Sequence, residues 1–132
     1  MWRAEIRRKR TTESRWISAS GEMSEITAVT NPQGAYGADV ISRITFVMEE
    51  QGNLSIIHKA VIDCINRSIE EFSENLHIRA ENIYQFAVVG NTTMSHVFLD
   101  VDPSALAVAP FAPVFTRGRQ ASARQLGLQA NE

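Results

Sequence analysis

The chain has 132 residues, of which 44% are hydrophobic, and it carries a formal net charge of −2 at pH 7. This size fits one domain or part of a larger one, and the small net charge excludes a general electrostatic attraction to nucleic acid or membranes. The single cysteine, Cys64, excludes an internal disulfide and any site built from several cysteines. The sequence holds no apolar run long enough for a membrane span, and we expect a cytoplasmic protein.

The first ten residues hold five basic side chains and lack the apolar stretch of a secretory signal. We interpret residues 1–13 as a disordered basic N-terminus and residues 14–132 as the folded region. A nucleic-acid binder that uses this basic cluster is the least favoured function. The basic residues are Arg3, Arg7, Arg8, Lys9 and Arg10.

The folded region opens with a predicted β-hairpin. Residues 15–18 and 23–30 favour two strands, and the intervening Ser20-Gly21 is a turn signal. Residues 31–39 follow as a loop, because they contain two glycines and a proline, which cannot donate to a sheet. We expect this loop and the helix start after it to lie at the surface.

Two helices are predicted next from apolar residues at helical spacing. The first runs from about Ala38 to Glu50, and the second, from Asn53 to about Glu74, is the clearest amphipathic helix in the chain. Cys64 lies on the apolar stripe of the second helix, and we interpret it as a small buried hydrophobe. In the first helix, Asp39 and Arg43 are four residues apart, as in an ordinary i, i+4 ion pair.

The stretch Ile83–Leu99 is the one around which the rest of the chain is organised. Its first half, up to Val89, is apolar nearly throughout and predicts a strand buried on both faces. Gly90 ends the strand, and each of the next three residues can cap a short helix. In open α/β sheets ligands bind at such strand ends, and the free N–H groups of a helix start favour anions. By spacing alone, a turn that only joins two elements is the favoured alternative.

The region beyond this turn carries weaker signals. His96 either donates to a bound anion or is a satisfied histidine on a helix face, and the second alternative is favoured. The two prolines of Ala109–Pro113 force extended backbone, which Phe111 and Phe115 would anchor to a core. Residues 121–126 predict a weak helix.

A set of sequence blocks between about Ser20 and Phe115 is specific when taken as a group. The blocks are Asn31-Pro32-Gln33, Tyr36 to Ile44, Val88 to Met94 with His96, Asp102-Pro103, and Ala109 to Pro113. In order and spacing they resemble the reductive activators of corrinoid proteins, also called corrinoid activation or regeneration proteins. Several blocks that match together are much more specific than any one of them.

This resemblance implies an α/β fold, namely a partial ribonuclease H-like domain of the superfamily of actin, sugar kinases and heat-shock ATPases (ASKHA). Such activators couple ATP hydrolysis to electron transfer onto a cobalt(II) corrinoid, which restores the cobalt(I) state for methyl transfer. The implied cofactors of full-length members are ATP, Mg and a [2Fe-2S] cluster held in an N-terminal domain. The implied partner is a corrinoid protein, and self-association as a homodimer through an exposed sheet edge is an alternative.

The chain lacks the family's sequence motifs at the positions where phosphate and iron–sulfur ligands are expected. The family's Asp-Ile-Gly-Thr-Thr phosphate motif has no match in Arg7–Glu13, and its second phosphate motif would lie beyond Glu132. Asp100 stands where the family usually has glycine, and the iron–sulfur cysteines are absent. We therefore expect an internal fragment that binds none of these cofactors alone and is inactive alone. The alternative is a non-catalytic docking or dimerising α/β module.

The residues expected to face a ligand or partner come from two blocks, the loop with the first helix start and the turn after the central strand. No metal site is expected because the three histidines are scattered, and no catalytic residue is assigned. The first block contributes Asn31, Gln33, Asp39 and Arg43, and the second contributes Gly90, Asn91, Thr92, Thr93 and His96.

Overall fold

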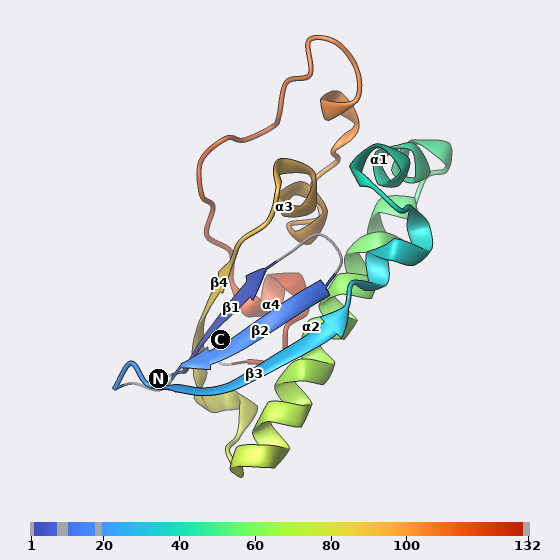
Figure 1. Cartoon of the computed structure of the whole chain (residues 1–132). Helices are drawn as coiled ribbons and strands as arrows, with labels where there is room; N and C mark the ends of the chain where they lie inside the picture. Colours follow the sequence, from blue (N-terminus) through green and yellow to red (C-terminus); the bar gives the residue numbers. More distant parts are fainter. Residues whose placement is uncertain (1, 8–10, 18–19, 131–132) are drawn as a thin grey trace.

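The computed structural model describes residues 2–7, 11–17 and 20–130, which form one sheet accompanied by helices (Figure 1). The strands are β1 (Trp2–Arg7), β2 (Thr11–Ile17), β3 (Met23–Thr30) and β4 (Ile83–Val88). The α-helices are α1 (Val40–Glu49), α2 (Asn53–Leu76), α3 (Thr92–Phe98) and α4 (Ala123–Leu126). Three short 3-10 helices are η1 (Pro32–Tyr36), η2 (Ala80–Asn82) and η3 (Ser104–Leu106).

The four strands lie in the order β3-β2-β1-β4. β1 pairs antiparallel with β2, and β2 with β3, whereas β1 and β4 are parallel. A parallel neighbour requires a crossover connection, and α1 and α2 lie in the connection between β3 and β4. The α/β class is confirmed, and so is the predicted hairpin, although its first strand begins at Thr11 instead of residue 15.

The N-terminal residues belong to the sheet, and the prediction of a disordered terminus over residues 1–13 is wrong for β1 and for the start of β2. β1 is an inner strand, so its backbone groups bond to neighbours on both sides. Its apolar residues alternate with charged ones, a period-two pattern that the basic net charge conceals. Arg8, Lys9 and Arg10 lie outside the described residues.

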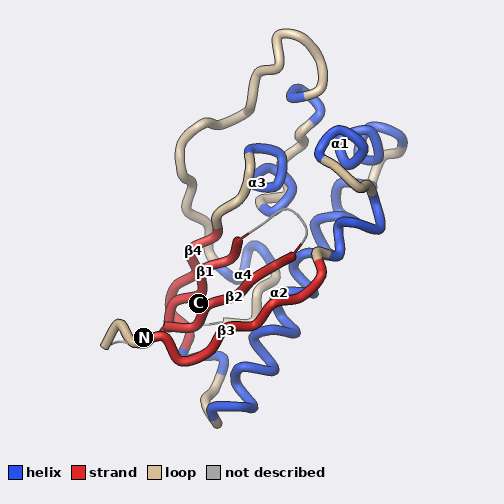
Figure 2. The backbone as a smooth tube through the Cα atoms, viewed as in Figure 1, coloured by secondary structure: helices blue, strands red, loops and turns tan. Residues whose placement is uncertain are grey.

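The core is built on α2, which lies along one face of the sheet (Figure 2). Ile65, Ile69 and Phe72 of this helix are buried in one cluster with Ile83 of β4 and with Leu128. Each large apolar side chain buried in this way stabilises the fold by about 1.5–3 kcal/mol. Cys64 is also buried on this helix, as expected of a small hydrophobe.

β4 is an edge strand, and the prediction of a strand buried on both faces is wrong. Ile83 is buried and Phe86 half-buried, but Tyr84 is 56% exposed and Val88 is 38% exposed. An apolar strand is buried on both faces only where other elements of the fold cover both faces of the sheet. Whether they do so depends on the topology of the whole chain and cannot be read from the strand itself.

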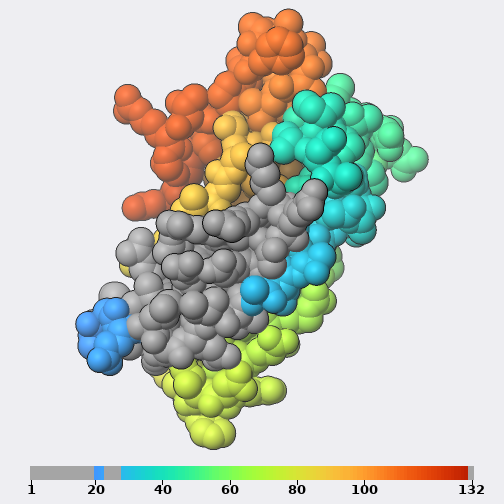
Figure 3. Space-filling view, viewed as in Figure 1, coloured from blue at the N-terminus to red at the C-terminus, as the bar shows by residue number. Residues whose placement is uncertain are grey.

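The chain after α3 forms a long irregular segment that projects from the body before it returns to the core (Figure 1). In the space-filling view this segment stands next to α1, and α1 contacts η3 (Figure 3). α4 confirms the weak helix predicted over residues 121–126. Its C-terminal side is fixed to α2, because the Asn66 amide donates to the Gly127 carbonyl (2.9 Å) and accepts from the Gln129 N–H (2.9 Å).

Candidate functional site

Arg43 joins the two blocks that were expected to face a ligand. It lies on α1, and its Nε donates to the Gly37 carbonyl (2.9 Å) while its Nη1 contacts Sδ of Met94 on α3 (3.3 Å). The two blocks, 51 residues apart in sequence at this contact, therefore lie side by side in the structure. Burial lowers the pKa of Arg43, whereas the negative charge of Asp39 opposes this shift.

Gly37 is required by this arrangement. A Cβ at this position would lie 2.6 Å from Oγ of Ser42 and 2.7 Å from the backbone nitrogen of Arg43. Both separations are shorter than real Cβ contacts, and one of them involves backbone that cannot move aside. The glycine therefore permits a close approach of the loop to α1, which puts its carbonyl within reach of the guanidinium.

Asp39 starts α1 as its N-cap. Its carboxylate accepts from the Ser42 N–H (2.8 Å), and the Ser42 hydroxyl accepts from the Asp39 N–H (3.1 Å), which completes a capping box. These bonds from Ser42 lower the pKa of Asp39, and the charge of Arg43 lowers it less. Asp39 and Arg43 thus have other hydrogen-bond partners, and the ordinary ion pair predicted for them is replaced by these contacts.

The structure buries five of the nine predicted site residues. Their exposed fractions are 5% or less, so the expectation that the first block is a surface loop and helix start is wrong for its Asn, Gln and Arg residues. Their role toward a ligand stays a prediction. The buried residues are Asn31, Gln33, Arg43, Thr93 and His96, whereas Asp39, Gly90, Asn91 and Thr92 are exposed.

Gln33 is fully buried, and its side-chain amide has no hydrogen-bond partner among the described residues. Asn31 holds the turn beside it, since its Oδ1 accepts from the Gln33 N–H (3.0 Å), but its own Nδ2 is also unpartnered. An unsatisfied buried polar group costs about 1–3 kcal/mol, so each such group in a native fold calls for a physical explanation.

His96 is the satisfied helix histidine that the sequence favoured. It is fully buried, its Nδ1 lies 2.7 Å from the Thr92 carbonyl, and its Nε2 accepts from the Val114 N–H (3.1 Å). These partners assign the proton to Nδ1 of a neutral ring. Phe115 stacks on the imidazole at 4.3 Å, and the Arg119 guanidinium lies 5.7 Å from the Phe115 ring centre. His96 therefore fastens the irregular segment to α3 and has no ring nitrogen left for a ligand.

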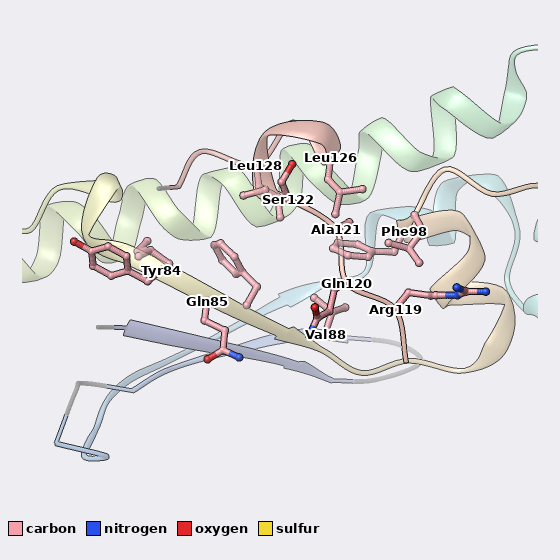
Figure 4. A pocket seen from close by; sticks show the side chains of 14 residues that line it. Tyr84, Gln85, Val88, Phe98, Arg119, Gln120, Ala121, Ser122, Leu126 and Leu128 are labelled. Carbon is pink, nitrogen blue, oxygen red and sulfur yellow. The ribbon is translucent and has the colours of Figure 1, made fainter. Parts of the chain in front are cut away.

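The exposed part of the second block lies at the C-terminal end of β4. Asn91 caps α3 by accepting from the Met94 N–H (2.8 Å), as predicted. Gly90 and Thr92 line a cavity of about 280 Å³, whose other wall includes Arg117 and Arg119. A second cavity, of about 350 Å³, continues along β4 below α4 (Figure 4). The predicted turn thus opens to solvent at the end of the strand.

Several residues of this region were not found from the sequence. Phe115 was expected to anchor the irregular segment and does so, but Phe111 was expected to do the same and is 62% exposed. Arg117 and Arg119 gave no signal in the sequence, and the contact of Met94 with Arg43 could not be found because 51 residues separate the two.

Two structural tests bear on the implied cofactors. The residues that the structure describes contain no cluster of three or more His, Cys, Asp or Glu side chains able to hold a metal ion. Cys64 is buried on α2, so it does not fit a [2Fe-2S] cluster.

Across the described part of the chain, no helix combines the length and apolar character needed to cross a membrane.

Comparison with known proteins defines the class of protein. Residues 18–132 match the family model described as the RACo middle region. The chain therefore belongs to this family, and the resemblance to corrinoid activators is confirmed.

Two individual proteins are similar to the chain. It is 36% identical over 92 residues to the corrinoid activation enzyme RamQ of Eubacterium limosum, a match that covers 70% of this chain and 16% of that enzyme. The solved structure of a reductive activator for a corrinoid, iron-sulfur protein matches 98% of this chain and 20% of its own length, with a TM-score of 0.89 and 28% identity. The chain thus spans no more than about a fifth of either protein.

Proposed function

We propose that this chain is a piece of a corrinoid reductive activator, namely part of its ATPase region, and that it has no activity alone. The observation that carries this proposal is the ratio of the two coverages in the structural match. Nearly the whole chain, 98%, corresponds to only 20% of an activator. We assign the fold to the ribonuclease H-like type of the ASKHA superfamily, a proposal supported by the mixed β3-β2-β1-β4 sheet and its crossover helices.

In a whole activator, ATP hydrolysis would supply the free energy and an iron–sulfur domain the electron for reducing cobalt(II) to cobalt(I). This chain would contribute the framework between its two motif blocks. Arg43 would hold the loop of Asn31 and Gln33 against α3, while Gly90 and Thr92 stay exposed toward a ligand or partner. The proposed partner is a corrinoid protein, and the proposed location is the cytoplasm.

We derive no step through ATP or Mg for this chain. Mg prefers carboxylate oxygens, and two described carboxylates of this region already accept hydrogen bonds within the chain. Asp39 caps α1, and Asp102 accepts from the Ser104 N–H (2.8 Å). The stretch Arg7–Glu13, where the family has its acidic phosphate motif, is mostly basic. The chain alone therefore is not expected to bind ATP.

Calorimetric titration of the chain with Mg-ATP tests this proposal. We expect no binding at micromolar nucleotide, and full occupancy at micromolar affinity would contradict the fragment interpretation.

A chimera gives the positive test. The matching segment of the RamQ enzyme is replaced by this chain, once as it stands and once with Asp-Ile-Gly-Thr-Thr restored in the stretch Arg7–Glu13. We expect ATP-dependent corrinoid reduction only with the restored motif. If both chimeras are folded and inactive, the chain is the non-catalytic docking or dimerising module that the exposed edge of β4 favours as the second candidate.

A further inference from the structure

Two amide side chains at the start of η1 are buried together with polar atoms that have no partner. Asn31 is the N-cap of η1, and Gln33 follows it by two residues. Oδ1 of Asn31 accepts from the Gln33 N–H, which fixes the orientation of the Asn31 amide and leaves its nitrogen over. The atoms without a hydrogen-bond partner among the described residues are Nδ2 of Asn31 and both Nε2 and Oε1 of Gln33.

The fold itself encloses these atoms. Asn31 is 4% exposed and Gln33 is 0% exposed, and η1 packs against α1 and α2. A partner protein, or another segment of a longer protein, therefore could not reach them without opening this part of the fold. Whatever satisfies them is small enough to lie inside it.

The hydrogen-bonding chemistry of the three atoms selects the small molecule. The two amide nitrogens can only donate, and Oε1 of Gln33 can only accept. An anion cannot donate to Oε1, and a cation cannot accept from the amide nitrogens. Water does both, and a buried water typically makes about three hydrogen bonds to groups that would otherwise be unsatisfied.

The alternative is that all three atoms stay bare. Each would then lose its hydrogen bonds to water on folding and gain nothing in return. Proteins are only marginally stable, so three such losses in one turn would cancel a large part of the free energy of unfolding. This imbalance argues for an occupant.

We propose that Asn31 and Gln33 form an internal binding site for one ordered water molecule under η1. The water donates to Oε1 of Gln33 and accepts from Nε2 of Gln33 and Nδ2 of Asn31. By bridging the two side chains it fixes the loop that leads to Gly37, whose carbonyl accepts from Arg43. The site needs neither nucleotide nor corrinoid protein, so it goes beyond the proposed function and stands or falls separately from it.

Nuclear magnetic resonance of the isotope-labelled chain, without nucleotide, tests the site directly. We expect cross-peaks between water and the side-chain amide protons of Gln33 and Asn31, with opposite signs in NOE and ROE spectra. A long-lived bound water gives opposite signs, whereas proton exchange gives the same sign in both. The amide of Gln51, which is exposed in the turn between α1 and α2, should give no such cross-peaks, because surface water exchanges too fast.

A variant shows whether the two side chains share the water. Gln33→Met keeps the length of the side chain and removes both of its polar atoms, so the bound water loses two of its three partners. The cross-peak from water to the Asn31 amide should then disappear. The matched control, Gln51→Met, makes the same change at an exposed position and should leave the cross-peaks of Asn31 and Gln33 as they are.

The unmodified chain decides the outcome even if Gln33→Met fails to fold. A Gln33 amide without a cross-peak to bound water overturns the proposal. An Asn31 cross-peak that persists unchanged in folded Gln33→Met overturns it too, because the water would then not be held by Gln33.

Discussion

The two motif blocks differ in what their polar side chains do. In the first block, Asn31 and Arg43 are buried and bond to backbone groups of the loop, whereas in the second block Gly90 and Thr92 stay exposed beside a cavity. Both blocks consist of polar residues and glycines, and both were expected to face a ligand. A pattern of polar residues and glycines therefore indicates that the backbone adopts a particular local conformation. Which of the polar side chains reach solvent depends on the tertiary structure.

The largest effect is expected at Gly37, where the first block is tightest. Gly37→Val would put a side chain into space that Ser42 and the Arg43 backbone already occupy, and we expect a loss of about 3 kcal/mol in the free energy of unfolding. Urea denaturation measures it. Gly34→Ala is the matched control, because a Cβ at Gly34 meets nothing within 4 Å, and it should change stability by no more than about 0.5–1 kcal/mol. Equal effects at both glycines would show that the close approach to α1 has no importance.

The next effect tests the link between the blocks. Arg43→Ala leaves the Gly37 carbonyl without its donor and opens space in a buried region, so we expect a loss of about 2 kcal/mol. Met94→Leu keeps the volume and removes the sulfur contact. A double-mutant cycle of these two changes should give a coupling free energy of about 0.5 kcal/mol or more. Additive effects would mean that Arg43 stabilises its own block only.

His96 should show a smaller and more local effect in the second region. His96→Phe keeps a ring for Phe115 to stack on but removes the acceptor for the Val114 N–H, and we expect a loss of about 1–2 kcal/mol. Hydrogen exchange should become faster at the Val114 amide. The amides of Ile65 and Ile69 on α2 serve as internal controls, because they report global unfolding. If the Val114 amide exchanges as before, His96 does not fasten the irregular segment.

The parts of the fold that depend on local pattern could be predicted. α1 and α2 follow from apolar residues at helical spacing, and β2 and β3 follow from two β-prone runs around a turn. β1 was not predicted, because charged residues alternate with its apolar residues. The positive net charge of the first ten residues suggested a solvated terminus instead. The exposure of β4 could not be predicted either, because the position of a strand in a sheet is a property of the whole chain.

The site was predicted less well for the same physical reason. Asn91 caps its helix through a bond to a residue three positions away, so spacing alone found it. Asp39 caps α1 in the same way, but its spacing to Arg43 had suggested an ion pair instead. The contact of Arg43 with Met94 joins residues 51 positions apart, and that of His96 with Val114 joins residues 18 apart. No local sequence pattern contains such pairs. The burial of Arg43 and His96 depends on these long-range contacts, so it could not be predicted either.

The smallest effect is expected at Asp39, the exposed member of the first block, and it depends on pH. Bonds from Ser42 lower the pKa of its carboxyl below the ordinary value of 3.8. Because the pKa is lower in the folded state, the charged cap stabilises the fold fully above about pH 3.8, and this stabilisation is lost as the pH falls through the folded pKa. Asp39→Asn keeps a capping oxygen that does not titrate. In urea midpoints measured from neutral to acid pH, the unmodified chain should lose stability relative to Asp39→Asn only at the acid end. Asp39→Ser, another cap that does not titrate, should follow the Asn variant. Parallel profiles for all three chains would show that the charge of Asp39 contributes nothing to the start of α1, and that the capping oxygen alone sets it.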